Sequence, residues 1–180
     1  RSRITAVTEK SGGSGRLVFV DVAHETHGAA GLAVREVQSL VYREPAAPGT
    51  PPAPPPLGEG RFDPAGWDQH RVIEPSAPLL FRFSALTFNS HRIHYDAPYA
   101  TDEEGYRGLV VHGPLTATLL LDLAQRSLGD NALKTFAFRG MSPAVADEAL
   151  HLVMRGKGEA IELGAFAADG RQVMSGSASA

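Results

Sequence analysis

The densest group of polar residues in the 180-residue chain lies between positions 87 and 96. Asn89, His91, His94 and Asp96 all fall within it, and His112 follows shortly after, so three of the seven histidines lie within 22 positions. An imidazole titrates near neutral pH, and an amide or carboxylate beside it can orient water or exchange a proton. These residue types at this spacing indicate proton transfer on a bound substrate.

A second chemical feature is the Val111-His112-Gly113-Pro114 segment. Proline near a first helical position and glycine before it are typical of a helix start. The first N–H groups of a helix have no partner inside the helix, and the positive end of the helix dipole lies there. Gly113 adds no side chain, so this terminus is suited to holding a developing oxyanion.

Both features resemble those of a known family. His94, Asp96, Tyr99 and Ala100 match the ending His-x-Asp-x-x-Tyr-Ala of the hydratase and dehydratase motif of the MaoC-like hotdog superfamily. The wider run over residues 88–96 and 108–115 resembles one subgroup, the mesaconyl-CoA and itaconyl-CoA hydratases and the type 2 3-hydroxyacyl-thioester dehydratases. Asn89 stands where the superfamily usually has a catalytic Asp, His91 replaces the usual Asn, and Arg92 replaces the Pro.

The resemblance implies an acyl-CoA hydratase that also runs as a dehydratase and needs no cofactor. In that role His94 is the general base, and Asn89, with His91, orients the water. The N–H of Gly113 donates to the thioester oxygen, where enolate charge develops. Asn89 cannot ionise, so His91 or Asp96 is left to supply a second proton-transfer group.

The remaining polar residues are expected to contact the substrate. Arg92 offers a planar, bidentate partner for a free carboxylate on the acyl group. Tyr95, Asp96 and His112 are further candidate substrate-binding residues. The acyl group stays open between mesaconyl, itaconyl and related branched enoyl esters, carried by CoA or by acyl carrier protein.

Three alternative functions use the same residues. A hotdog thioesterase would hydrolyse the acyl-CoA instead of hydrating it, and the missing Asp makes a non-catalytic acyl-binding or partner subunit conceivable. A metal site could be built from His91, His94 and Asp96, since a His/His/carboxylate set is a chemically plausible ligand group. We expect no bound metal, because the loop is short and the sequence offers no evident partner to orient these ligands by hydrogen bonding.

Composition limits the class of protein and its partners. Lys and Arg number 17 against 20 Asp and Glu, for a formal net charge of -3, and basic residues form no runs. We therefore expect no nucleic-acid partner and no membrane partner. Cysteine is absent, which fits a reducing compartment, so the cytoplasm is the expected location. The expected partners are the acyl-CoA substrate and further copies of the chain, in a homodimer or higher homo-oligomer.

The pattern of the first 44 residues predicts strands. Ser2 to Thr8, Gly15 to His24 and Leu32 to Tyr42 are short apolar or alternating runs separated by glycine-rich turns. No helical pattern accompanies them. Seven of the 13 prolines then fall within twelve residues, between Pro45 and Pro56. Such a stretch supports neither helix nor sheet ladder, so we expect a connector over residues 45–70.

After the connector, the pattern predicts one long helix and four strands. Phe81 to Phe88 alternates imperfectly and ends in a polar loop. Leucines at three-four spacing then predict a helix from Gly113 to about Leu128. Strand patterns follow, joined by turn signals, at Lys134 to Arg139, Ala149 to Gly156, Glu159 to Ala167 and Gln172 to Ser179.

These elements predict an α+β fold in which an antiparallel sheet wraps around one central helix. With the resemblance, this is a hotdog fold, and in the resembled subgroup two tandem halves form a double hotdog. The expected domains are residues 1–44, as the last strands of a partial N-terminal hotdog, and residues 71–180, as the hotdog that carries the motif. The apolar face of the first strands would then be covered by further chain or by a second subunit.

Overall fold

The computed structural model describes residues 1–12, 15–43 and 54–180. The chain divides into two compact units, Arg1–Thr50 and Pro51–Ala180, and each is described by itself. Part of the predicted proline-rich connector, residues 45–53, lies outside the described residues, as do two residues of the first predicted turn, Gly13 and Ser14.

The first unit is a three-stranded antiparallel sheet. Its strands are β1 (Ser2–Gly12), β2 (Gly15–Gly28) and β3 (Gly31–Arg43), in the order β1-β2-β3. All three predicted strands are confirmed, and each is longer than its apolar pattern. The valines of β3 stay largely exposed, because the residues that the structure describes in this unit include no helix to cover the sheet.

The second unit contains a five-stranded sheet in the order β4-β6-β7-β8-β5, with every neighbouring pair antiparallel. The four strands predicted after the long helix are confirmed within one or two residues. The short strand β4 was not predicted, because its five residues alternate too briefly to stand out. The strand bounds are β4 (Gln69–Ile73), β5 (Thr135–Gly140), β6 (Leu150–Lys157), β7 (Ala160–Ala167) and β8 (Gln172–Ser179).

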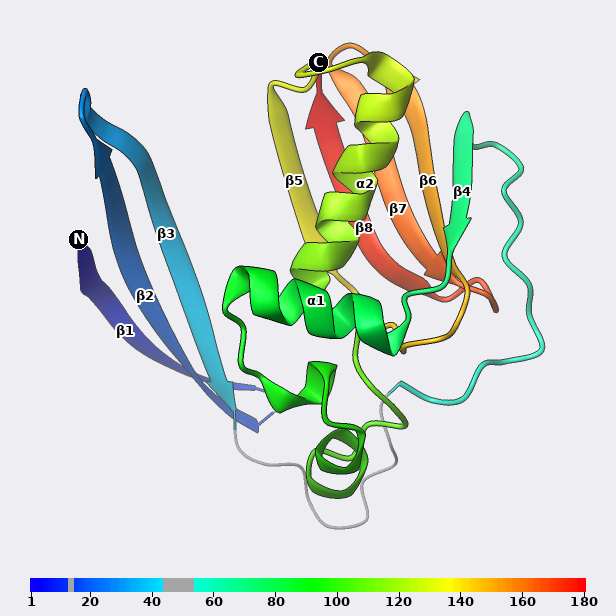
Figure 1. The fold of residues 1–180 in the computed structure, drawn as a ribbon, viewed down its shortest axis with the longest axis horizontal. Helices are drawn as coiled ribbons and strands as arrows, with labels where there is room; N and C mark the ends of the chain where they lie inside the picture. The colour runs from blue at the N-terminus through cyan, green and yellow to red at the C-terminus, as the bar shows by residue number, and fades with distance from the viewer. Residues whose placement is uncertain (13–14, 44–53) are drawn as a thin grey trace. The chain divides into compact units, whose positions relative to one another are not determined.

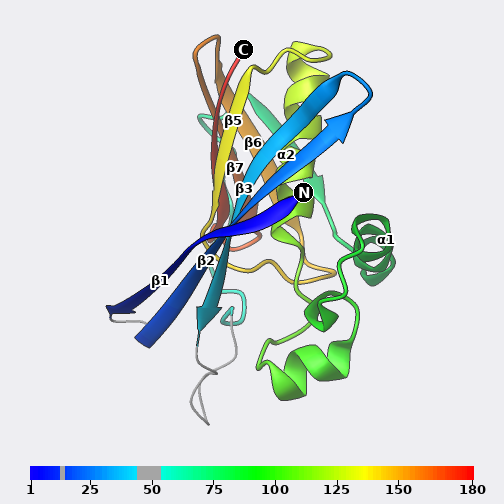
Figure 2. The same ribbon diagram turned by 90° about the vertical axis from the view of Figure 1, so that its left-hand side faces the viewer.

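Helix α2 (Gly113–Leu128) lies against one face of this sheet, in agreement with the predicted helix (Figures 1 and 2). It has Pro114 in its first turn, and Gly129 caps its end by donating its N–H to the carbonyl of Gln125. No helix in the described ranges is long and apolar enough to cross a membrane.

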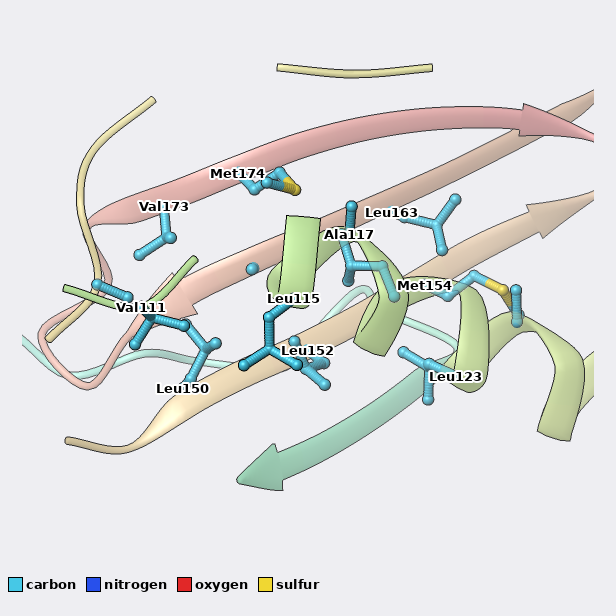
Figure 3. Packing of buried hydrophobic residues seen from close by; sticks show 14 of the residues in the cluster. Val111, Leu115, Ala117, Leu123, Leu150, Leu152, Met154, Leu163, Val173 and Met174 are labelled. Atoms are coloured by element: carbon cyan, nitrogen blue, oxygen red, sulfur yellow. The ribbon is translucent and has the colours of Figure 1, made fainter. Parts of the chain in front are cut away.

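The core of this unit lies between α2 and the sheet. Leu115, Leu120 and Leu123 project from one stripe of the helix, each no more than 5% exposed. Alternate residues of β6 meet this stripe, because successive side chains of a strand point to opposite faces. Figure 3 shows several residues of this core: Leu115 and Leu123 of α2, Leu150, Leu152 and Met154 of β6, and Leu163 of β7.

A second helix, α1 (Ala77–Thr87), corrects the prediction of a single helix. The imperfect alternation over Phe81 to Phe88 is part of a helical face on which Leu80 and Ser84, four residues apart, are buried. Pro78 fixes the helix start, as it suits the first turn. The pattern was weak because a helix of 11 residues shows only one pair of buried positions.

The last part of the predicted connector packs on the sheet face opposite α2. The Phe62 and Phe166 rings stack with centroids 4.8 Å apart, and the Trp67 ring meets Phe166 edge-on with centroids 6.0 Å apart. Phe166 points away from the core because its neighbours Ala165 and Ala167 are both core residues of β7. Trp67 therefore fastens this segment to the outer face of the sheet and does not line a pocket beside α2.

We predict that Leu152→Ala, at a fully buried position of β6, lowers the free energy of unfolding of the second unit by about 2–5 kcal/mol. The substitution removes apolar contacts and leaves a cavity against α2. Urea unfolding followed by circular dichroism measures the change. The control is Leu86→Ala on α1, where the side chain is 80% exposed and the expected change is about 0.5 kcal/mol or less. Equal losses for the two variants would contradict this account of the core.

Candidate active site

The chain enters the motif loop through a left-handed residue at the end of α1. Phe88 has a φ of 52°, which bulky side chains seldom adopt. The N–H of Asn89 then donates to the carbonyl of Ser84 at 2.9 Å, and the N–H of His91 donates to Oδ1 of Asn89 at 2.9 Å. Asn89 thus organises the first turn of the loop through its oxygen, and its NH₂ group supplies two further donors.

His94 lies in a short 3-10 turn, Arg92–His94, and is bonded to Val110. The N–H of Val110 donates to the carbonyl of Ile93 at 2.9 Å, and Nδ1 of His94 bonds the Val110 carbonyl oxygen at 2.7 Å. A short antiparallel bridge to Val145 fixes Val110 in turn. This pairing joins the motif loop to the segment that leads into α2.

The bond to Val110 determines the tautomer of His94. A carbonyl oxygen only accepts, so Nδ1 carries the proton and Nε2 of the neutral ring is the basic nitrogen. The side chain is buried, and burial lowers the pKa of His94 below its ordinary value; the Val110 carbonyl opposes this shift and nearby His91 adds to it. His94 is therefore neutral and able to accept a proton at neutral pH.

His112, the residue before Gly113, stacks on His94. The two ring centroids are 3.6 Å apart and the planes differ by 18°. Nε2 of His112 lies 2.8 Å from Oγ of Ser84, which is itself buried on α1. Burial is the main cause that lowers the pKa of His112 to about 4, and the neighbouring His94 adds to it. His112 stays neutral beside His94, and its place at the start of α2 brings His94 and the helix terminus together.

His91 lies at the edge of this pair. Its ring centroid is 5.6 Å from that of His94, and the rings are nearly perpendicular. The side chain is exposed, unlike those of His94 and His112. Its ring therefore lies open to solvent while it remains near His94.

Arg92 and Asp96 form an ion pair on the surface of the loop. Nε and Nη2 of Arg92 both donate to Oδ2 of Asp96, at 3.0 and 2.7 Å. The guanidinium also lies over the Tyr99 ring, 4.1 Å from its centroid. The other Asp96 oxygen accepts from the Tyr99 N–H, and Arg92 lowers the pKa of Asp96. The pair shapes the loop, and Asp96, as a low-pKa carboxylate, is poorly suited to accept a proton.

A groove of about 340 Å³ lies beside the loop. The Tyr95 hydroxyl donates to the Ser90 carbonyl at 2.8 Å, which fixes the ring along this groove. Two site residues, Ser84 and Asn89, belong to the lining, so a ligand in the groove would reach the motif loop and α1 at once. The lining residues are Phe81, Ser84, Ala85, Phe88, Asn89, Ser90 and Tyr95.

Gly113 begins α2 and is exposed. The first helical bond runs from the N–H of Thr116 to the carbonyl of His112 at 3.1 Å, so the N–H of Gly113 precedes the helical ladder. A Cβ at this position would meet no atom within 4 Å. The glycine is thus not required by packing inside the chain, and its small size leaves the helix terminus open to a ligand.

The structure brings together the predicted residues His94, His91 and His112 with the start of α2, and places Asn89 at the head of the same loop. It ties Arg92 to Asp96 and Tyr95 to Ser90. Sequence reasoning missed Ser84 and the Val110 carbonyl. Ser84 becomes noticeable once α1 is known to be a helix, as a polar residue on its buried face.

A metal centre finds no support among the described residues. In the ranges 1–12, 15–43 and 54–180, no group of three or more His, Cys, Asp or Glu side chains is arranged to hold an ion. Asp96, which the metal alternative requires, is instead engaged by Arg92.

Comparison with solved structures defines the class of fold. An (R)-hydratase from A. caviae matches 61% of this chain and 89% of its own, with a TM-score of 0.55 and 18% identity. A MaoC-like dehydratase from Phytophthora Capsici matches 99% of this chain and 62% of its own, with a TM-score of 0.67 and 14% identity. The antiparallel sheet wrapped along α2 is therefore a hotdog fold of the MaoC-like class.

Comparison of sequences gives the family. The model of the hydroxyacyl-thioester dehydratase type 2 family matches residues 1–146. The chain is 45% identical over 172 residues to the mesaconyl-C(4)-CoA hydratase of Chloroflexus aurantiacus, a match that covers 96% of this chain. The chain belongs to the hydroxyacyl-thioester dehydratase type 2 family, and it spans about 59% of the length of that relative.

We predict that the buried, neutral His112 makes stability depend on pH. Unfolding returns its pKa from about 4 to about 6.5. Between these values the unfolded chain binds the extra proton, so stability falls as pH drops from about 6.5 to about 4, by up to about 3 kcal/mol. In His112→Phe this part of the fall is absent.

Urea unfolding at several pH values between 7 and 4 measures the difference between wild type and His112→Phe. The control is His27→Phe, at an exposed histidine of β2, which should keep the wild-type pH dependence. If His112→Phe also keeps the full dependence, His112 is not held neutral by burial.

Proposed function

We propose that the chain carries the active site of an acyl-thioester hydratase that also runs as a dehydratase. The observation that carries this proposal is the stack of His94 on His112, which places a neutral base beside the start of α2. A base and a set of free N–H groups are what reversible hydration of an enoyl thioester requires. Family membership and the hydratase relative support the same reaction.

In the hydration direction, His94 takes a proton from water at Nε2 as the oxygen bonds to the β-carbon of the enoyl thioester. Electron density moves to the thioester oxygen, and the N–H of Gly113 stabilises the resulting enolate. As the enolate collapses, a second proton-transfer group delivers a proton to the α-carbon, which gives the 3-hydroxyacyl thioester. Dehydration is the reverse sequence. The unpaired N–H groups and the positive dipole end at the start of α2 stabilise this negative charge. No charged side chain is therefore needed at the thioester oxygen.

Asn89 takes the place of an ionisable group. Its oxygen accepts from the His91 N–H, so its NH₂ group remains to donate to the water or to the substrate hydroxyl. We assign it the role of orienting that oxygen atom. His91, exposed and next to His94, is the better candidate for the second proton transfer, because Asp96 is held ionised by Arg92.

The expected substrate is a CoA thioester, and within that class we propose a short acyl group with a free carboxylate. The named substrate of the 45% identical relative supports this choice. Two of the five N–H groups of Arg92 donate to Asp96. The other N–H groups are available to a substrate carboxylate. Tyr95 remains a proposed substrate contact at the groove.

The wider organisation is also a proposal. We infer that residues 1–44 and 71–180 belong to two hotdog units of a double hotdog, separated by the connector 45–70. The division into two units and the likeness of 99% of the chain to the Phytophthora dehydratase support this arrangement. A homodimer or higher homo-oligomer, a cytoplasmic location and independence from cofactors are expected of the whole protein.

We predict that His94→Ala lowers kcat for hydration of mesaconyl-CoA at least about 100-fold, the typical contribution of a general base, while the fold survives. Loss of enoyl absorbance and mass analysis of the product measure the rate. The control is His151→Ala, a histidine of β6 on the sheet face opposite α2, which should keep turnover. Retained turnover in His94→Ala would refute the assignment.

Release of free CoA thiol would instead identify a thioesterase, and binding without turnover would identify an acyl-binding subunit.

We predict that Arg92→Met selectively impairs dicarboxylic substrates. The variant should raise KM for mesaconyl-CoA by about tenfold or more, since a charge-assisted bond to a carboxylate is lost, and should leave crotonyl-CoA hydration within about twofold. Steady-state kinetics on the two esters provide the measurement. Arg126→Met, at an exposed arginine of α2, is the control. Equal losses on both esters would show that Arg92 acts through the loop, by its bond to Asp96.

A further inference from the structure

Two polar side chains, Ser84 and His112, are buried where α1 meets the start of α2. Ser84 is 5% exposed and His112 is 1% exposed. Burying a polar group is costly unless it is hydrogen-bonded, and these two bond each other, with Oγ and Nε2 2.8 Å apart. Burying a hydroxyl and an imidazole at this junction costs more free energy than burying an apolar pair. The polar pair therefore points to a role besides packing.

The His112 ring is fixed from three directions. Ser84 bonds its Nε2, the Phe83 ring meets it edge-on with centroids 4.9 Å apart, and His94 covers one face at 3.6 Å. Helix α1 thus supplies two contacts, from adjacent residues, and His94 supplies the third. A ring held in this way has one orientation, and it presents a flat surface to His94.

His94 in turn has two fixed points. Its Nδ1 bonds the Val110 carbonyl, and its face lies on His112. The Val110 bond alone would permit the ring to rotate about the axis through that nitrogen. The stack removes this freedom, because a ring parallel to His112 within 18° has a defined plane. The position of Nε2 then follows from both contacts together.

The surroundings of the stack keep His112 neutral beside His94. His112 has a pKa of about 4, from burial and from the neighbouring His94. Burial lowers the pKa of His94, and His91 on the motif loop is the ionisable neighbour that adds to this shift. Helix α1 faces the stack with the uncharged Ser84 and Phe83, and the first turn of α2 has no ionisable side chain. His112 therefore orients the base without competing for its proton.

We propose that Ser84 and His112 are positioning residues for His94, an inference that rests on the proposed function. Ser84 fixes the His112 ring, and the His112 ring fixes the plane in which Nε2 of His94 meets its proton. His112 also precedes Gly113 directly, so the same residue sets the spacing between the base and the oxyanion donor. A displacement of about 1 Å at either point is enough to cost roughly 100-fold in rate.

The experiment compares three variants of the protein, Ser84→Ala, His112→Ala and His112→Phe. Ser84→Ala should lower kcat about tenfold, the worth of one hydrogen bond, with KM within about twofold. His112→Ala should lower kcat by roughly 100-fold. His112→Phe keeps a flat ring against His94 and should recover a large part of that loss.

Two matched controls separate positioning from general damage. Ser127→Ala removes a hydroxyl that donates only within α2, to the carbonyl of Leu123. His151→Ala removes a stacked imidazole from the opposite face of the sheet, where it pairs with His70. Both controls should keep kcat within about twofold of wild type, so a larger loss in Ser84→Ala or His112→Ala belongs to the junction of α1 and α2.

A second measurement needs no turnover. Nitrogen-15 NMR of the His94 imidazole reports its tautomer and its titration. In His112→Ala, water reaches the ring and relieves the desolvation that lowers its pKa, so the titration of His94 and the acidic limb of kcat/KM both move to higher pH. A residue that only stabilised the fold would lower the melting temperature and leave the titration of His94 in the folded protein unchanged.

The outcomes distinguish the two proposals. Unchanged kcat in Ser84→Ala and His112→Ala, or losses confined to KM, or equal activity of His112→Phe and His112→Ala, would overturn the positioning role. If wild type lacks hydratase activity, the proposed function fails, and an unchanged His94 titration in His112→Ala would then overturn the positioning role as well. If His112→Ala does not fold, Ser84→Ala and the NMR titration of His112→Phe decide the question.

Discussion

The stack of His94 on His112 is the contact on which the site depends. It joins two segments that are separated in sequence, the motif loop after α1 and the first residue before α2. Both rings are buried, and two stacked cations would repel each other in a low-dielectric environment. The pair is therefore kept neutral, and a neutral imidazole with one committed nitrogen is a base ready for use at neutral pH.

The rest of the second unit supports this contact. The leucine stripe of α2 fixes the helix on the sheet, and that fixes where the helix begins. The Val110 carbonyl and its bridge to Val145 fix the loop on the other side. The site is thus built at the end of a packed core, where precise placement comes from burial and the N–H groups of the helix start remain open.

The loop shows how a departure from the superfamily pattern is accommodated. Asn89 occupies the usual acid position, and its oxygen accepts a backbone N–H that turns the loop. Arg92, in place of a proline, pairs with Asp96 and lies over Tyr99. A proline restricts the loop through its ring, whereas here an ion pair and an aromatic contact restrict it. These substitutions therefore act together on the shape of the same loop.

The sequence by itself determined most of the elements and the residues of the candidate site: the three first strands, the four strands after α2, the start of α2 at Gly113, and the group of histidines around residues 91 to 112. Each rests on local periodicity, turn residues or a motif. Only the tertiary structure decided that residues 77–87 are helical, that Ser84 bonds His112, that Val110 fixes the tautomer of His94, and that Arg92 is paired with Asp96. The Ser84–His112 and His94–Val110 contacts join residues that are distant in the chain. The Arg92–Asp96 pair is local, but it depends on the turn that the backbone makes at Arg92–His94. A linear pattern encodes neither.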